Sequence, residues 1–258
     1  MPIARRGRWL SLPLRRRLRP RHAARPVLPP GEAAAIRLLA ARTSGVRRLL
    51  AVHLWLVIKE PGGAYERWDV VGRRARTGRI GLQRNVCPPD DSWAGHAPRL
   101  VLALDGAAAE QVLPALRAAI AAYPDRNGYR AWPGPNCNSF VAWLAREVPG
   151  LHASLPPLAI GKDYLGSHKL LARTPSGTGW QLSLLGLAGI TLAAGEGLEL
   201  MLGGLVLGVG WRPWRLKLPL AGEIGRGGLG RGGLGQLSPG ARASPSRPAP
   251  AGGRDRSR

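Results

Sequence analysis

The segment with the tightest conformational constraint is residues 132–140, which read Trp-Pro-Gly-Pro-Asn-Cys-Asn-Ser-Phe. Each proline locks its own φ angle and keeps the preceding residue out of the helical region, so the first half of the segment forms a rigid turn. Apolar residues at helical spacing follow, namely Phe140, Val141, Leu144 and Val148. The pattern predicts an amphipathic helix that begins here, with Asn136 as its N-cap and Cys137 in its first turn.

Cys137 is the residue of this segment that could carry chemistry. A thiol in the first turn of a helix faces the positive end of the helix dipole, which favours the nucleophilic thiolate. Free cysteines are also among the most frequently buried residues, so a structural role fits the same position. The helix alone leaves both a nucleophile and a small core side chain open.

A β-hairpin is predicted upstream of this helix. The run Leu49–Lys59 has the composition of a strand, and the turn residues at 60–63, Glu-Pro-Gly-Gly, lead into a returning strand over Tyr65–Val71. Successive side chains of a strand point to opposite faces. One face of the first strand therefore carries His53, Trp55, Val57 and Lys59.

Two charged residues share one face of the returning strand, Arg67 and Asp69, so either can lie beside His53. A carboxylate in that place can orient an imidazole, as in catalytic triads, which makes Asp69 a candidate site residue. A solvated charge on a strand is the simpler alternative.

The remaining central elements indicate an α+β domain, because strands precede helices instead of alternating with them. The helical pattern at 107–123 contains Pro114, which is unfavourable inside a helix. The expected elements are a short helix over Ala33–Ala41, strands near Ile80–Val86 and Leu100–Leu104, and a helix over Ala107–Tyr123.

The apolar stretch Leu182–Trp211 has the length of a membrane span, but Glu196 and Glu199 lie within it and glycine is frequent. Alternation such as Leu198-Glu199-Leu200 predicts a glycine-rich β-meander instead. The simplest interpretation is a sheet that covers the core and has a basic rim. Attachment to a membrane surface is the alternative, because Trp211, Trp214 and arginines lie together.

Charge is concentrated at the two ends of the chain, whose formal net charge is +23. Residues 1–50 contain 13 arginines and one acidic residue, and residues 226–258 contain seven arginines and one aspartate. Such segments bind polyanions without specificity, so an anionic membrane surface is a candidate partner and a specific nucleic acid is not expected. The tail at 226–258 is rich in Gly, Arg, Pro and Ser and is expected to be disordered.

No cofactor or metal ion is expected from the sequence. The two cysteines, Cys87 and Cys137, form no zinc motif, and a disulfide between them has no framework motif behind it. No histidine pair with ligand spacing, no phosphate-binding loop and no Gly-x-Ser-x-Gly elbow occurs.

Several segments resemble a bacterial family known as domain of unknown function 3750, over about residues 41–225. The resemblance is carried by residues 132–140, by 51–59 (Ala-Val-His-Leu-Trp-Leu-Val-Ile-Lys), 69–72 (Asp-Val-Val-Gly), 159–164 (Ala-Ile-Gly-Lys-Asp-Tyr) and 174–179 (Thr-Pro-Ser-Gly-Thr-Gly). The family implies no established activity. Its members tend to carry serine at the position of Cys137, so a thiol does not define the family.

A second resemblance concerns the order of the chemical groups. A histidine at the start of a strand, followed much later by Asn-Cys-Asn-x-Phe at the start of a helix, resembles circularly permuted papain-like hydrolases such as the PPPDE peptidases and lecithin retinol acyltransferase-like proteins. This resemblance implies that Cys137 is the nucleophile and His53 the general base. Asn136, Asn138 and Trp132 are then the candidate substrate or oxyanion residues, with the backbone N–H groups of Cys137 and Asn138 nearest the reacting carbonyl.

The expected organisation is an Arg/Pro-rich arm at 1–45, a permuted papain-like α+β domain at 46–172, a Gly/Leu-rich β extension at 173–225 and the basic tail. The leading hypothesis is a Cys-His hydrolase or acyltransferase acting on an amide or thioester bond, with a peptide or a lipid as candidate substrate. The alternative is a non-catalytic envelope or membrane-surface module. No signal peptide or transmembrane helix is predicted, and both a cytoplasmic and a peripheral membrane location fit. The sequence leaves the oligomeric state open.

Overall fold

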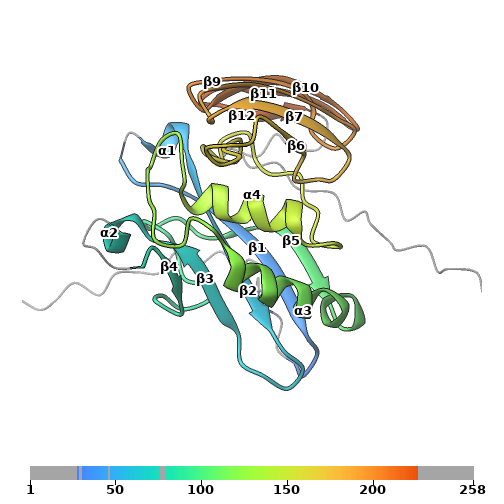
Figure 1. Ribbon diagram of the computed structural model, residues 1–258. Coiled ribbons are helices and arrows are strands. Elements are labelled where there is room, and N and C mark those ends of the chain that lie inside the picture. Colours follow the sequence, from blue (N-terminus) through green and yellow to red (C-terminus); the bar gives the residue numbers. More distant parts are fainter. Residues whose placement is uncertain (1–27, 29–30, 46, 76–79, 226–258) are drawn as a thin grey trace, which may run out of the picture.

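A computed structural model describes residues 28, 31–45, 47–75 and 80–225 of the chain. The described chain forms two antiparallel sheets and four helices, which is an α+β fold (Figure 1). The longest helices, α3 (Ala107–Ala122) and α4 (Cys137–Glu147), pack on one face of the first sheet, and α4 lies between the two sheets.

The first sheet has five strands in the order β4-β3-β2-β1-β5. All four neighbouring pairs are antiparallel. The hairpin expected from the sequence is present as β2 and β3, and the strands expected near 80–86 and 100–104 are present as β4 and β5. The strand bounds are β1 Ala35–Arg42, β2 Val52–Lys59, β3 Glu66–Val70, β4 Leu82–Arg84 and β5 Arg99–Asp105. Two single-turn helices, α1 (Arg47–Leu50) and α2 (Gly72–Ala75), lie in the connections.

The helix predicted over Ala33–Ala41 is wrong, because this segment is the strand β1. β1 pairs with β2 on one side and β5 on the other, and both of its faces are buried. A strand buried on both faces is a continuous apolar run, which periodicity cannot distinguish from a buried helix. The core sheet thus begins at Ala35, inside the region expected to be an N-terminal arm.

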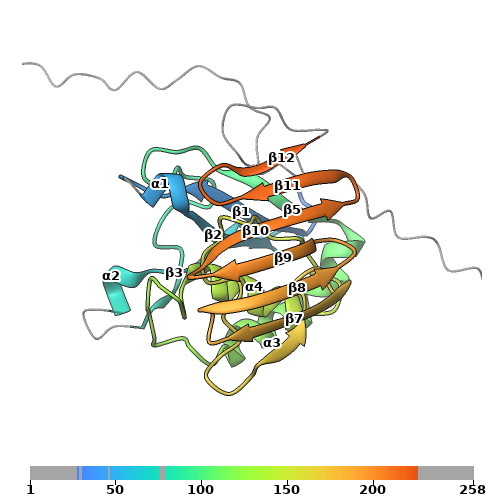
Figure 2. The same ribbon diagram turned by 90° about the horizontal axis from the view of Figure 1, so that it is seen from above.

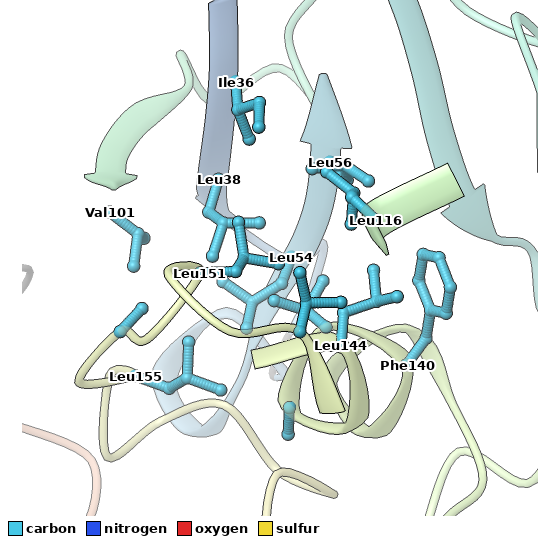
Figure 3. Packing of buried hydrophobic residues seen from close by; sticks show 14 of the residues in the cluster. Ile36, Leu38, Leu54, Leu56, Val101, Leu116, Phe140, Leu144, Leu151 and Leu155 are labelled. Carbon is cyan, nitrogen blue, oxygen red and sulfur yellow. The ribbon is translucent and has the colours of Figure 1, made fainter. Parts of the chain in front are cut away.

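The hydrophobic core lies between the first sheet and the helices α3 and α4. Leu54 and Leu56 of β2 belong to one cluster with Phe140 and Leu144 of α4 (Figure 3), and all four side chains are fully buried. Pro114 is accommodated within α3, whose apolar positions face the same cluster. Burial of apolar side chains of this size, each contributing about 1.5–3 kcal/mol, fixes the Cys-bearing helix on the sheet.

The second sheet is a seven-stranded meander in the order β12-β11-β10-β9-β8-β7-β6 (Figure 2). The apolar stretch Leu182–Trp211 is therefore not a membrane-spanning helix but a series of short strands joined by tight turns, as its alternating pattern predicts. The strands of the second sheet are β6 Leu171–Arg173, β7 Gly179–Leu184, β8 Ala188–Ala193, β9 Gly197–Leu202, β10 Leu205–Trp211, β11 Trp214–Leu218 and β12 Gly222–Gly225.

The face of the second sheet that lies toward the rest of the protein is largely polar, although Ala193, Met201 and Val206 are buried there as well. Glu199 of β9 is buried there and binds two lysines, with its carboxylate 2.7 Å from Lys162 Nζ and 2.5 Å from Lys217 Nζ. Lys162 also pairs with Asp163 at 2.9 Å. The leucines that flank Glu199 face outward and are exposed. The second sheet lies over the core, as expected from the sequence. Its leucines, however, are on the side that faces away from the core.

None of the helices in the described residues is long and apolar enough to cross a membrane. The predictions for residues 1–27 and for the tail at 226–258 concern parts of the chain outside the described residues.

We predict that Glu199→Gln lowers the free energy of unfolding by about 3 kcal/mol, because two buried ammonium groups lose their shared carboxylate. Urea titration followed by circular dichroism measures the change. Glu60→Gln is the matched control, since the ion pair of Glu60 with Arg117 is half exposed and is worth at most about 1 kcal/mol. Equal losses for the two variants would contradict a stabilising role for the buried carboxylate.

Candidate active site

The first turn of α4 is fixed by a reciprocal cap, as the sequence predicts. The Asn136 side chain accepts hydrogen bonds from the backbone N–H groups of Asn138 at 2.9 Å and Ser139 at 3.1 Å. Ser139 Oγ in turn accepts from the backbone N–H of Asn136 at 2.6 Å. This capping box holds Cys137 as the first residue of the helix.

The Asn136 cap is itself held by the two segments around it. Its Nδ2 donates to the carbonyls of Ala131 and Ile160, each at 3.1 Å. The next residue, Gly161, has a φ of +97°, and a Cβ at this position would lie 2.4 Å from Asn136 Nδ2. Glycine is required at this point for both reasons, which gives a physical role to the Ala-Ile-Gly segment.

Asn138 joins the helix to the strand that carries His53. β3 pairs with β2 only at residues 56–58, so the start of β2 has no strand neighbour on that side. The Asn138 side chain takes that place, because its Oδ1 accepts from Leu54 N at 3.1 Å and its Nδ2 donates to Val52 O at 3.0 Å. These two backbone groups flank His53, so one buried amide sets the position of the histidine relative to Cys137.

The structure brings together His53, Cys137 and Asp69, the three residues assigned to catalysis from the sequence. His53 Nε2 lies 3.6 Å from Asp69 Oδ2, which is an ion-pair contact slightly longer than a hydrogen bond. Cys137 is the neighbour that raises the pKa of the imidazole most, and its Sγ lies 3.6 Å from Asn138 Oδ1. His53 and Asp69 are 3% and 2% exposed, and Cys137 is 7% exposed.

Electrostatics favour the charged form of the imidazole in this cluster. Burial by itself lowers the pKa of His53, but Cys137 and then Asp69 outweigh it and raise the pKa to about 9. Burial opposes ionisation of Asp69, yet His53 and Arg67 hold the pKa of its carboxyl below the usual value. At neutral pH His53 is therefore protonated and Asp69 is ionised.

Arg67 is a further member of the cluster, on the same face of β3 as Asp69. Its Nη2 and Nε lie 2.9 and 3.0 Å from Asp69 Oδ2, and its side chain is 1% exposed. The guanidinium carbon lies 4.4 Å from the centre of the Trp55 ring. Arg67 thus fixes the carboxylate that contacts the histidine, and an aromatic ring fixes Arg67.

Trp93 covers the imidazole and was not predicted from the sequence. Its ring stacks on His53 with centroids 3.7 Å apart and planes 12° apart. The segment Trp93-Ala94-Gly95-His96 is a tight turn in which Trp93 and His96 exchange both backbone hydrogen bonds, with φ of 52° and 82° at the two central residues. The Ala-Gly pair was the only local signal, and it indicates a turn without showing what the tryptophan contacts.

The residues predicted to bind the substrate or the oxyanion, namely Asn136, Asn138 and Trp132, are each engaged in structural hydrogen bonds. The backbone N–H of Asn138 donates to the Asn136 cap, so it is engaged within the helix start. Trp132 donates from Nε1 to Gly203 O at 2.8 Å, in the turn between β9 and β10. Asn136 is the helix cap. Of the two N–H groups considered for an oxyanion, Cys137 N–H is the one not engaged by the cap.

The thiols are not paired with each other, because Cys87 and Cys137 are both free. Within residues 28, 31–45, 47–75 and 80–225, no group of three or more His, Cys, Asp or Glu side chains is placed to hold a metal ion. The polar cluster around His53 thus consists of Cys137, Asp69 and Arg67 with two aromatic neighbours.

A family model described as "Protein of unknown function (DUF3750)" matches residues 33–164. The chain belongs to this family. The DUF3750 match contains the five-stranded sheet, α3, α4 and every residue of the His53 cluster, and the seven-stranded sheet lies beyond it. The segment 174–179, which resembles the family pattern, is outside the match. The chain matches no curated protein and no solved structure.

We predict that Asn138→Ala lowers the free energy of unfolding by about 2–4 kcal/mol, because it leaves buried backbone groups of β2 without partners. Asn127→Ala is the matched control, since the Asn127 side chain is exposed. Urea unfolding of both variants measures the difference. Losses of similar size would show that Asn138 has no special role at the strand edge.

We predict that NMR titration of His53 gives a midpoint near pH 9, and that Cys137→Ala lowers the pKa of His53 by removing the contact that raises it most. Because the folded-state pKa exceeds the ordinary histidine value of about 6.5, this stabilising contribution is complete below about pH 6.5. It is lost as the pH rises through about 9. Cys87→Ala is the control and leaves the titration unchanged; a midpoint near 6.5 in the unmodified protein would contradict the charged cluster.

Proposed function

We propose that the protein is a Cys-His hydrolase or acyltransferase that acts on an amide or thioester bond. The observation that supports this most directly is the buried chain of contacts from Cys137 through His53 to Asp69, at the N-terminus of a capped helix. A nucleophile, a base and a group that orients the base are the components that nucleophilic catalysis requires. The order of His before Cys and the packing of the Cys-bearing helix on the His-bearing strand agree with a permuted papain-like arrangement.

In the proposed reaction the Cys137 thiolate attacks the substrate carbonyl while His53 holds the proton as imidazolium. The backbone N–H of Cys137 donates to the developing oxyanion. Collapse of the tetrahedral intermediate breaks the amide or thioester bond, and His53 gives its proton to the leaving amine or thiol. Water, or an acceptor nucleophile in an acyl transfer, then attacks the acyl-Cys137 and loses its proton to His53. Collapse of this second tetrahedral intermediate breaks the bond between the acyl carbon and the Cys137 sulfur, releases the acyl product and restores the thiolate beside the His53 imidazolium.

Asp69 and Arg67 act through His53 and are positioning residues. Asp69 stabilises the imidazolium at 3.6 Å, and Arg67 fixes the carboxylate at 2.9 Å. Asp69 is a buried carboxylate between the buried His53 and Arg67, so each of these three charges is compensated by a neighbour.

The second candidate function is a non-catalytic module at an envelope or membrane surface. The observation that favours it is the closure of the cluster, since Trp93 stacks on His53 and Cys137 is 7% exposed. Under the catalytic proposal the turn at 93–96 must move to admit a substrate. The two proposals therefore differ in whether opening this turn exposes a reactive thiol.

We predict that iodoacetamide alkylates Cys137 faster than Cys87 near neutral pH, and that Trp93→Ala increases the rate at Cys137 by roughly tenfold, because it uncovers the imidazole side of the cluster. His53→Ala and Asp69→Asn slow the reaction at Cys137. Peptide mass spectrometry gives the rate at each thiol, and Cys87 is the internal control.

A second readout in the same proteins is capture of an acyl group from a p-nitrophenyl ester. Under the catalytic proposal Cys137 gains one acyl group, and Cys137→Ser abolishes the thioester. Equal alkylation of both thiols that is unaffected by His53→Ala, together with no acyl capture in Trp93→Ala, would favour the non-catalytic module.

A further inference from the structure

The outer face of the seven-stranded sheet carries rows of apolar side chains in cross-strand register. The longest row crosses every strand of the sheet. It consists of Arg173, Trp180, Leu192, Leu198, Val209, Leu216 and Ile224, each the registered partner of the next.

Two shorter rows run beside the first. One is Leu171, Leu182, Ile190, Leu200 and Leu207, and the other is Leu184, Ala188, Leu202 and Leu205. We call the residues of the three rows the outer face. Leu192 and Leu202 are 60% and 76% exposed, and the other large side chains of the outer face are exposed as well.

A sheet that covers a core ordinarily turns its apolar side chains inward, and this sheet turns them outward. Gln181, Ser183, Thr191, Glu199 and Lys217 of the same strands point toward the protein and are buried. Figure 1 shows the sheet edge-on above α4, with its other side open, and Figure 2 shows that open side spread over the molecule. Only every second residue of a strand faces outward, so each outward position takes up about 6.6 Å along its strand and about 4.8 Å across it. The 16 positions of the outer face therefore cover on the order of 500 Å². A patch of this size is as large as the largest apolar patch of a typical monomer, and such patches are often functional.

The chemistry of the outer face favours contact with lipid hydrocarbon over contact with another protein. Among the described residues of the three rows, Arg173 at the β6 edge is the charged one, and the Trp180 indole is the one other side chain with a polar atom. A protein partner presents backbone and side-chain polar groups that need about one hydrogen bond per 100–200 Å², and this face offers almost none. The interior of a bilayer makes no such demand.

The rim of the outer face has the residues that suit a lipid headgroup region. Arg173 lies 4.3 Å from the centre of the Trp180 ring at one end of the sheet. Trp214 is 69% exposed at the other end, beside the exposed Arg212 in the turn between β10 and β11. Tryptophan and arginine are enriched where a protein meets the boundary between hydrocarbon and water.

Charge also favours an anionic surface over a second copy of the chain. β12 ends at Gly225 at the edge of the sheet, and the 33 residues after it contain seven arginines and one acidic residue. A formal charge of +23 on each molecule opposes self-association and attracts anionic lipid.

We propose that the outer face of the seven-stranded sheet is a membrane-docking surface that inserts its leucine rows into the acyl region of an anionic bilayer. The flanking arginines contact lipid phosphates, and Trp180 and Trp214 lie at the headgroup boundary. This surface is separate from the His53 cluster, and its role does not depend on the thiol chemistry of Cys137.

The test is co-sedimentation of the full chain with phosphatidylcholine vesicles that contain about one third phosphatidylglycerol, at low salt and at 1 M NaCl, where the Debye length is about 3 Å. We expect binding that persists at 1 M NaCl. Leu200→Thr/Leu207→Thr replaces two registered outer-face leucines, and we expect it to weaken binding by roughly tenfold or more. Leu49→Thr/Ile80→Thr is the matched control, because these side chains have similar exposure and lie outside the sheet.

A second measurement uses the unaltered protein, so it does not depend on folding of the leucine variant. Vesicles with brominated acyl chains should quench tryptophan fluorescence, and Trp180→Phe/Trp214→Phe should reduce the quenching. Binding that vanishes at 1 M NaCl and is unaffected by the leucine substitutions would assign attachment to the basic ends alone and overturn the proposal. A lipid-free dimer that Leu200→Thr/Leu207→Thr dissociates would assign the outer face to self-association instead.

Discussion

The buried side chain of Asn138 is the contact on which the arrangement of the first sheet and its helix depends. The start of β2 lacks a strand neighbour on one side, and buried backbone groups left without partners are costly. One amide supplies both a donor and an acceptor to this edge, and a second donation, to Ile160 O at 2.8 Å, connects the loop that also holds the Asn136 cap. Because Cys137 lies between these two asparagines, the same hydrogen bonds that complete the sheet position the thiol beside His53.

Charge compensation explains how so polar a cluster is tolerated inside the protein. An isolated buried charge costs several kcal/mol, but Arg67, Asp69 and His53 follow one another with alternating sign. Trp55 and Trp93 pack against this series from the same side of the sheet, so the surroundings exclude water as well. Exclusion of water strengthens each contact and ties the protonation of His53 to the presence of Cys137.

The second sheet is attached by polar contacts where a globular protein ordinarily uses apolar ones. Glu199 bridges Lys162 and Lys217, and Arg146 of α4 donates to Gln181 Oε1 at 2.7 Å. These bonds fix the sheet over α4 without using its leucines. The leucine rows are consequently left on the opposite side, and that is the physical origin of the large apolar surface.

Local signals were sufficient for the elements whose pattern is set by near neighbours: the hairpin β2–β3, the helix start at Asn136 and Cys137, and the meander. Alternation also made Asp69 a candidate neighbour of His53, which the resemblance to permuted papain-like hydrolases had singled out. Local signals failed for Ala35–Arg42, where burial on both faces removes the alternation that identifies a strand. The sequence determined that Glu199 and its neighbouring leucines occupy opposite faces, since that follows from the two-residue period of a strand. Tertiary structure alone decided which face of the second sheet turns inward. It also decided that Trp93 covers His53, because both features depend on contacts between residues far apart in the chain.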